Sequence, residues 1–132
     1  MKQQITTDKL AVPNGHFSQA TAIEAKGKLV FISGMTARTR DGTIAGIGDV
    51  EAQTRQVCEN LKAAAEAAGG SLDDVVRVDV YVRNMEHFPI IHKVRREYFN
   101  DPVPASTMVE VSKMVSADYL IEISAIAVLP EG

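Results

Sequence analysis

The sequence has one cysteine, few aromatic residues and no long apolar stretch, and each shortage excludes a class of protein. Because Cys58 is the only cysteine, an intrachain disulfide and a cysteine-built zinc site within one subunit are both excluded. Such cysteine usage is typical of a reducing compartment, so we expect a cytoplasmic protein. No apolar stretch approaches the length of a signal-peptide core or a membrane span, and no membrane partner is expected.

Positive charge is also scarce, with 14 lysines and arginines against 17 acidic residues. The net charge of -3 provides no general attraction to a phosphate backbone, and aromatic residues make up only 5% of the chain, too few for a base-stacking platform. The one basic run is Lys93, Arg95 and Arg96, which we expect to be the solvated face of a helix. A nucleic-acid partner is therefore not expected.

A chain of 132 residues that is 45% hydrophobic predicts a single domain, spanning 1–132. Residues 17–25 and 29–34 are predicted to pair as a β-hairpin through a turn at 25–28, and 38–48 to form a loop with a short edge strand at 43–47. Asp49 is a suitable N-cap for a helix that Gly69 and Gly70 end. Its expected apolar stripe contains Val57, Leu61, Ala64 and Ala68, with Cys58 as a buried structural thiol beside it.

The second half of the chain contains the clearest strand and a second helix. Residues 75–83 alternate, with Val76, Val78, Val80 and Val82 expected on the face that packs against helices. A helix is predicted from Met85 or Glu86 to about Tyr98, with Phe88, Ile91 and Val94 in its apolar stripe. Asn100, Asp101 and Pro102 end it.

Residues 104–128 form two alternating runs separated by a polar turn, which predicts a pair of strands. Thr107 and Val109 point to one side of the first strand, whereas Ser106 and Met108 point to the other. The whole order is β-β-α-β-α-β-β, an α+β fold with one sheet and two helices on one face. Its other face, which includes Asp79 and Tyr81, would be bare in a monomer, so we expect a subunit interface there.

The same stretch carries a family resemblance. P-A-x-x-x-V-E-V followed by I-E-I-x-A-I-A-V resembles the C-terminal signature of the RidA/YjgF family of small trimeric proteins, best known for imine and enamine deamination. Further matches include Phe17 to Ala20, Ser33-Gly34, Asn60 to Lys62 and the YVRNM stretch ending at Met85. The resemblance implies a chorismate-mutase-like, trimer-forming domain with a pocket at each subunit junction. No spacing of residues in the sequence predicts a metal site, and no cofactor is expected.

Two departures from the family pattern bear on function. The family's deaminases usually have arginine after P-A, thought to bind the substrate carboxylate, and glutamate at the end of I-E-I-E, thought to place the attacking water. Here these positions are Ser106 and Ser124, and serine cannot replace a guanidinium clamp. Both differences argue against a standard 2-imino-acid substrate.

The expected small-molecule pocket is therefore unusual. Its substrate-binding candidates, by match to the family, are Phe17, Ser33, His92, Ser106, Thr107, Met108 and Ser124. The catalytic residue is unknown, with His92 and Ser124 as candidates, because an imidazole can transfer protons near neutral pH. His92 stands at the edge of the apolar stripe, where a partly exposed histidine without chemistry is the alternative. Glu110 and Glu122 are expected to be structural.

Three functions remain open at this point. The first is a Rid-type deaminase or hydrolase acting on an imine, enamine or related amino compound. The second is a non-catalytic trimer that binds a metabolite or protein. The third is RNA cleavage, an activity attributed to some relatives and disfavoured by the acidic balance.

Overall fold

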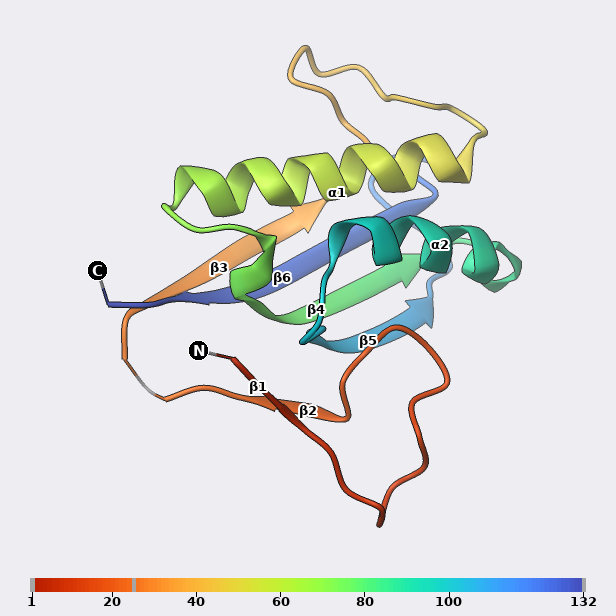
Figure 1. Ribbon diagram of the computed structural model, residues 1–132. Helices are drawn as coiled ribbons and strands as arrows, with labels where there is room; N and C mark the ends of the chain where they lie inside the picture. Colours follow the sequence, from red (N-terminus) through yellow and green to blue (C-terminus); the bar gives the residue numbers. More distant parts are fainter. Residues whose placement is uncertain (1, 25, 132) are drawn as a thin grey trace.

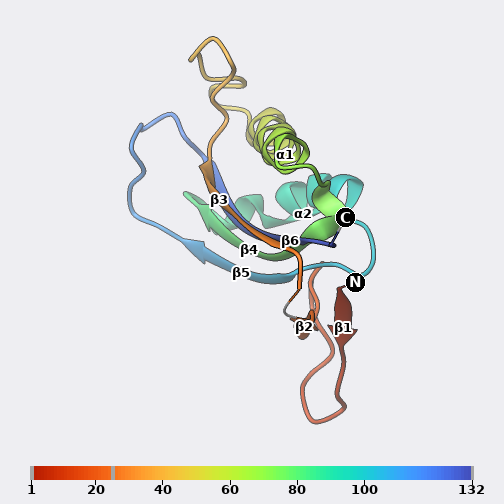
Figure 2. The same ribbon diagram turned by 90° about the vertical axis from the view of Figure 1, so that its left-hand side faces the viewer.

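A four-stranded mixed sheet forms the centre of the protein (Figure 1), in a computed structural model that describes residues 2–24 and 26–131. Its strands lie in the order β3 (Lys28–Met35), β6 (Ile121–Leu129), β4 (Val75–Val82) and β5 (Ala105–Glu110). Only β4 and β5 run parallel. The helices α1 (Val50–Ala67) and α2 (Phe88–Tyr98) both lie on one face of the sheet (Figure 2). The predicted α+β class is confirmed.

The N-terminal strands depart from the prediction. β2 (Ala20–Ala22) pairs with β1 (Gln3–Ile5) in a separate two-stranded sheet, whereas β3 pairs with β6, so the hairpin between 17–25 and 29–34 is wrong. The proposed turn at 25–28 includes Ala25, which lies outside the described residues. Lys2 Nζ and Thr21 Oγ1 donate hydrogen bonds to the carbonyls of Val75 and Val76, at 2.7 and 2.9 Å. These bonds attach the small sheet to the beginning of β4.

Helix α1 begins and ends as its sequence predicts. The Asp49 side chain accepts a hydrogen bond from the Ala52 amide at 3.1 Å, and Gly69 has a φ of +99°, which L side chains rarely adopt. Both predictions are confirmed. The buried face of the helix consists of Val50, Gln53, Thr54, Val57, Cys58, Leu61 and Ala65.

Gln53 ties α1 to two loops. Its amide nitrogen donates to the carbonyls of Gly46 and Asp118, and its side-chain oxygen accepts from the Leu120 amide at 2.9 Å. The loop at 38–48 has an isolated bridge between Arg38 and Ile44 in place of the short strand expected at 43–47. Residues 38–48 are therefore held at their C-terminal end by a buried amide rather than by strand pairing.

The alternation along β4 separates a closed face of the sheet from an open one. Val78, Val80 and Val82 are buried against the helices, together with Ile121 and Ile123 of β6. A register shift between Val75 and Arg77 places Val75 in the core and leaves Val76 half-buried, which corrects the expected position of Val76. The shift occurs at the point where a short 3-10 helix, η1 (Leu72–Asp74), leads into the strand.

The open face of the sheet carries exposed apolar side chains. Phe31 is 71% exposed and Leu29 56% exposed on the edge strand β3, and Val109 is 41% exposed on the other edge strand, β5. No element covers this face among the residues that the structure describes (Figure 2). Within the same ranges, no helix combines the length and apolar character needed to cross a membrane.

Candidate functional site

The predicted site residues are divided between the two faces of the sheet. Ser106 lies beside the inward-facing Val78, whereas Thr107 lies beside Asp79 on the open face. Ser124 also lies beside Asp79, from the opposite strand. Because side chains alternate along a strand, Ser106 belongs to the helix side and Thr107 and Ser124 to the open side. One chain alone therefore does not bring Ser106 and Ser124 into one pocket.

The helix side contains a cavity of about 200 Å³ between α2, β5 and the N-terminal segment. It brings together four of the predicted residues, Phe17, His92, Ser106 and Met108. We call it the α2 cavity; its complete lining is Asn14, Gly15, His16, Phe17, Phe88, His92, Arg95, Ser106 and Met108. The volume is below the roughly 300–1,000 Å³ of sites for drug-sized molecules, so it suits a compound of a few carbon atoms.

Hydrogen bonds to the chain around β5 hold the N-terminal wall of the α2 cavity in place. The buried Ser18 donates its amide to the Pro104 carbonyl at 3.2 Å and its hydroxyl to the Val103 carbonyl. His16 Nε2 donates to the Phe99 carbonyl at 2.8 Å. Phe17 lies between these two anchored residues, and its place in the cavity wall is thereby fixed.

Arg95 is the largest departure from the predicted site. It was expected on the solvated face of α2, but its side chain is 4% exposed and lines the α2 cavity. Its Nη2 donates a hydrogen bond to Ser106 Oγ at 2.9 Å. A guanidinium from α2 thus approaches the serine that stands at the position of the family's arginine.

His92 is buried rather than partly exposed. Its ring stacks on Phe88, with centroids 5.3 Å apart, and meets His16 edge-on at 5.8 Å. Burial lowers the pKa of His92 from its usual value, and the positive charges of Arg96 and Arg95 lower it further. A neutral imidazole at neutral pH is able to accept a proton in this cavity.

The open side has its own hollow of about 640 Å³, which is lined by Gly34, Tyr81, Glu122 and Ser124 among others. Glu122 lies over the Cα atom of Gly34, where an added Cβ would collide with the carboxylate oxygen Oε2. Glycine at 34 is therefore required for the carboxylate to keep its position. Ser33 is exposed and lines neither this hollow nor the α2 cavity.

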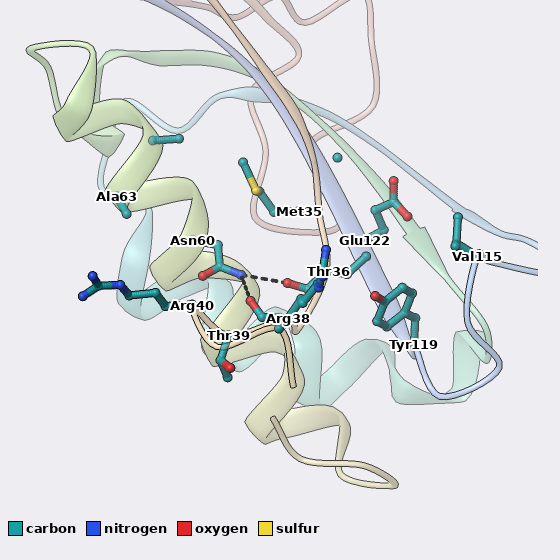
Figure 3. A pocket seen from close by; sticks show the side chains of 13 residues that line it. Met35, Thr36, Arg38, Thr39, Arg40, Asn60, Ala63, Val115, Tyr119 and Glu122 are labelled. Carbon is teal, nitrogen blue, oxygen red and sulfur yellow. Dashed lines mark hydrogen bonds between the residues drawn. The ribbon is translucent and has the colours of Figure 1, made fainter. Parts of the chain in front are cut away.

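A larger hollow of about 840 Å³ adjoins the open side and is shown in Figure 3. Asn60 of α1 donates to the carbonyls of Thr36 and Arg38, both at 2.9 Å, and so fixes one wall. Glu122 and Tyr119 lie on the opposite side of the view, and Arg40 points away from them (Figure 3). The hollow has few convergent polar groups and no buried charge, so we do not propose it as the catalytic site.

Glu110 and Cys58 have structural positions. Glu110 Oε1 accepts the Met85 amide at 2.8 Å, at the beginning of the 3-10 helix η2 (Met85–His87). Burial raises the pKa of the Cys58 thiol to about 12, and its side chain is fully buried. In the described part of the chain, no three His, Cys, Asp or Glu side chains are grouped to hold a metal ion.

The position of Arg95 differs from the expected solvated face because a run of basic residues does not by itself show which side of a helix each one occupies. Helical spacing contains the missing signal: His92 follows Phe88 by four residues and Arg95 follows Phe88 by seven, which puts all three on one face of α2. His16, Asn14 and Gly15 gave no comparable pattern, because they lie in a loop positioned by long-range hydrogen bonds.

Comparison with known proteins yields a consistent set of relatives. The family profile described as endoribonuclease L-PSP matches residues 7–129. A RutC family protein of Pyrococcus horikoshii is 46% identical over 96% of this chain and 98% of its own. A 2-iminobutanoate/2-iminopropanoate deaminase of Dermatophagoides farinae is 37% identical over 97% of each chain.

Solved structures agree with the sequence relatives. The structure of YyfB from Yersinia pestis, a member of the conserved Rid protein family, superposes with a TM-score of 0.88 at 30% identity and covers 97% of this chain and 98% of that one. With a profile match over nearly the whole length and relatives well above 30% identity, the chain belongs to the RidA/YjgF family.

Proposed function

We propose that the protein is a small-molecule deaminase that hydrolyses the C–N bond of an imine or enamine. The observation that carries this proposal is the α2 cavity, in which an imidazole, a guanidinium and a hydroxyl converge between apolar walls. A relative that is 37% identical along almost the whole chain is named as an iminobutanoate and iminopropanoate deaminase. The α2 cavity has room for substrates of that size.

The chemistry needs a water molecule and several proton transfers. An enamine first takes a proton on carbon, which gives an iminium ion, and loss of a proton from nitrogen then gives the imine. Water then adds to the imine carbon, and the resulting carbinolamine transfers a proton to nitrogen and releases ammonia, which leaves a carbonyl compound. We assign the proton transfers to His92, whose lowered pKa keeps it neutral and able to accept a proton from water.

The complete site is proposed to form between subunits of a homotrimer. Ser106 and Ser124 lie on opposite faces of the sheet, so only a second copy can bring an open-side surface against the α2 cavity. Phe31, Leu29 and Val109 provide exposed apolar area for that contact. In this arrangement Ser33, Thr107 and Ser124 of one copy face the α2 cavity of the next, with Ser124 as the second catalytic candidate.

The substrate is proposed to differ from the standard 2-imino acids. β5 carries a serine instead of an arginine, and Ser124 offers a hydroxyl where a carboxylate would position water. The α2 cavity keeps one guanidinium, that of Arg95, but the hydroxyl of Ser124 cannot activate water as a carboxylate does. We therefore expect weak activity on 2-aminoacrylate relative to a relative with both groups.

The test is ammonia release from a panel of imines and enamines generated in situ, including 2-aminoacrylate and 3-aminoacrylate. We expect the wild-type protein to release ammonia from at least one compound. The variant His92→Asn should lose this activity, and the surface variant Lys93→Gln should retain it. Light scattering coupled to size exclusion should give three times 14.3 kDa. A stable monomer that releases ammonia would disprove the intersubunit site.

A second candidate function is a non-catalytic trimer that binds a metabolite or a protein. The feature that favours it is the absence of any carboxylate from the lining of the α2 cavity, since a carboxylate is the usual group for placing water. Saturable binding of a panel compound without ammonia release would establish this function in place of deamination.

A further inference from the structure

Arg95 is a buried cation without a counterion in the described ranges 2–24 and 26–131. Its side chain is 4% exposed, and its one hydrogen bond goes to a neutral hydroxyl, Ser106 Oγ. Its Nε is buried with no hydrogen-bond partner. No acidic side chain described in the structure lies within ion-pair distance of it, although Arg55 and Arg77 elsewhere both have carboxylate partners.

The groups around Arg95 do not neutralise it. Cys58 is the one nearby group that could carry negative charge, but burial raises the pKa of its thiol to about 12, so it is neutral. The ring of His92 carries no negative charge, and His16 uses Nε2 to donate to the Phe99 carbonyl. Burying an unpaired charge is costly, and native structures rarely contain one without a purpose.

We propose that Arg95 is the anion-binding residue of the α2 cavity, and that its ligand is a small carboxylate-bearing compound. The small side chain of Ser106 leaves space for the guanidinium of Arg95, and its hydroxyl orients that guanidinium by accepting the hydrogen bond at 2.9 Å. The proposal deepens the proposed function, because it uses the same cavity and names the ligand class. It does not depend on catalysis, because anion binding requires only the cavity.

The geometry decides where the carboxylate would lie. A guanidinium presents donors in a planar fork that matches a carboxylate, and here that fork comes from α2, three residues after His92. The carboxylate is thereby held on the helix side of the cavity, next to the imidazole. A compound of about 200 Å³ or less fits the cavity in this orientation, with its C–N group within reach of His92.

Binding of propionate and of its neutral isostere propionamide tests the proposal. The signal is the ring resonance of His92 in NMR titrations of the assembled wild-type protein. The expected result is saturable binding of propionate about ten- to a hundredfold tighter than propionamide, the usual effect of one charge-assisted hydrogen bond. Arg95→Gln should abolish this preference, Arg95→Lys should keep part of it, and Lys93→Gln, which removes an exposed charge from the same helix, should keep all of it.

Each outcome decides the question. Equal binding of the two probes by folded wild-type protein, or no binding of propionate, would overturn the proposal and leave Arg95 as a structural residue. Because this comparison needs no variant, a failure of Arg95→Gln to fold does not affect it. Propionate preference without ammonia release from any compound would disprove deamination and leave the anion site standing, whereas ammonia release without propionate preference would do the reverse.

Discussion

The two faces of the sheet are made by the same strands and have opposite properties. On the helix face, Val78, Val80 and Ile123 are buried within one subunit. One residue along the same strands, Asp79 and Ser124 lie on the open face, which also carries exposed apolar side chains such as Phe31. The helix face forms a hydrophobic core within one subunit. The open face is a surface that becomes part of a ligand-binding site only when another molecule covers it.

This difference explains why neighbouring residues of one strand would contribute to binding sites in different parts of the assembly. Ser106 contacts Arg95 on the helix face, while Thr107 accepts a hydrogen bond from Arg77 at 2.8 Å on the open face. An alternation of one residue therefore separates the group that would bind a ligand from the group that would face a neighbouring subunit.

The largest effect is expected from truncating a core residue of the helix face. Ile123→Ala should lower the free energy of unfolding by about 2–5 kcal/mol, because it removes buried apolar contacts and leaves a cavity. Phe31→Ala on the open face is the matched control, and within a single subunit it should cost much less. Denaturant titration at low protein concentration measures both, and equal losses would show that Phe31 is buried within the subunit.

Phe31→Lys tests the open face in the opposite way. It should shift the light-scattering mass from three times 14.3 kDa toward that of one chain and leave the circular dichroism spectrum unchanged. A trimer that survives this change would mean that subunits associate through another surface.

A smaller loss of stability is expected from placing a second guanidinium on the helix face. Ser106→Arg would set two positive charges side by side in a buried cavity, and we expect a cost of about 1–3 kcal/mol. The double variant with Arg95→Gln should recover most of this loss, since it moves the cation from α2 to β5. Additive effects of the two substitutions in a double-mutant cycle would show that residues 95 and 106 do not interact.

The thiol of Cys58 offers a kinetic comparison. With its pKa raised to about 12 by burial, a thiol reagent should modify it slowly in the native protein and rapidly after denaturation. Rapid labelling of the native form would mean that the packing between α1 and α2 opens readily.

The smallest effect concerns pH. Because the pKa of His92 is lowered in the folded state, the unfolded chain binds more protons below about pH 6.5, and stability should fall as pH decreases through that range. His92→Asn should weaken this dependence in denaturant titrations performed at several pH values. An unchanged slope would assign the pH dependence to other groups.

The sequence predicted the regular elements well because their signals are local. Asp49, Gly69 and the alternation along residues 77–82 determine structure through caps and side-chain periodicity. The pairing of β2 with β1 was missed, since Gln3, Gln4 and Ile5 are all exposed and show no alternation of burial. The contact between Arg95 and Ser106 joins an arginine on α2 to the strand β5, and no pattern within either segment shows it.

The hydrogen bond from Arg95 to Ser106 has a consequence for how relatives are compared. One chain can place a guanidinium in a cavity from a strand and another can place it from a helix. A sequence alignment then shows serine at the strand position of the second chain and indicates a lost positive charge, although the cavity still contains that charge. Sorting such proteins by the residue after P-A alone would then separate chains that bind similar ligands. Superposition of the guanidinium positions in space, independent of residue number, gives the classification that the chemistry requires.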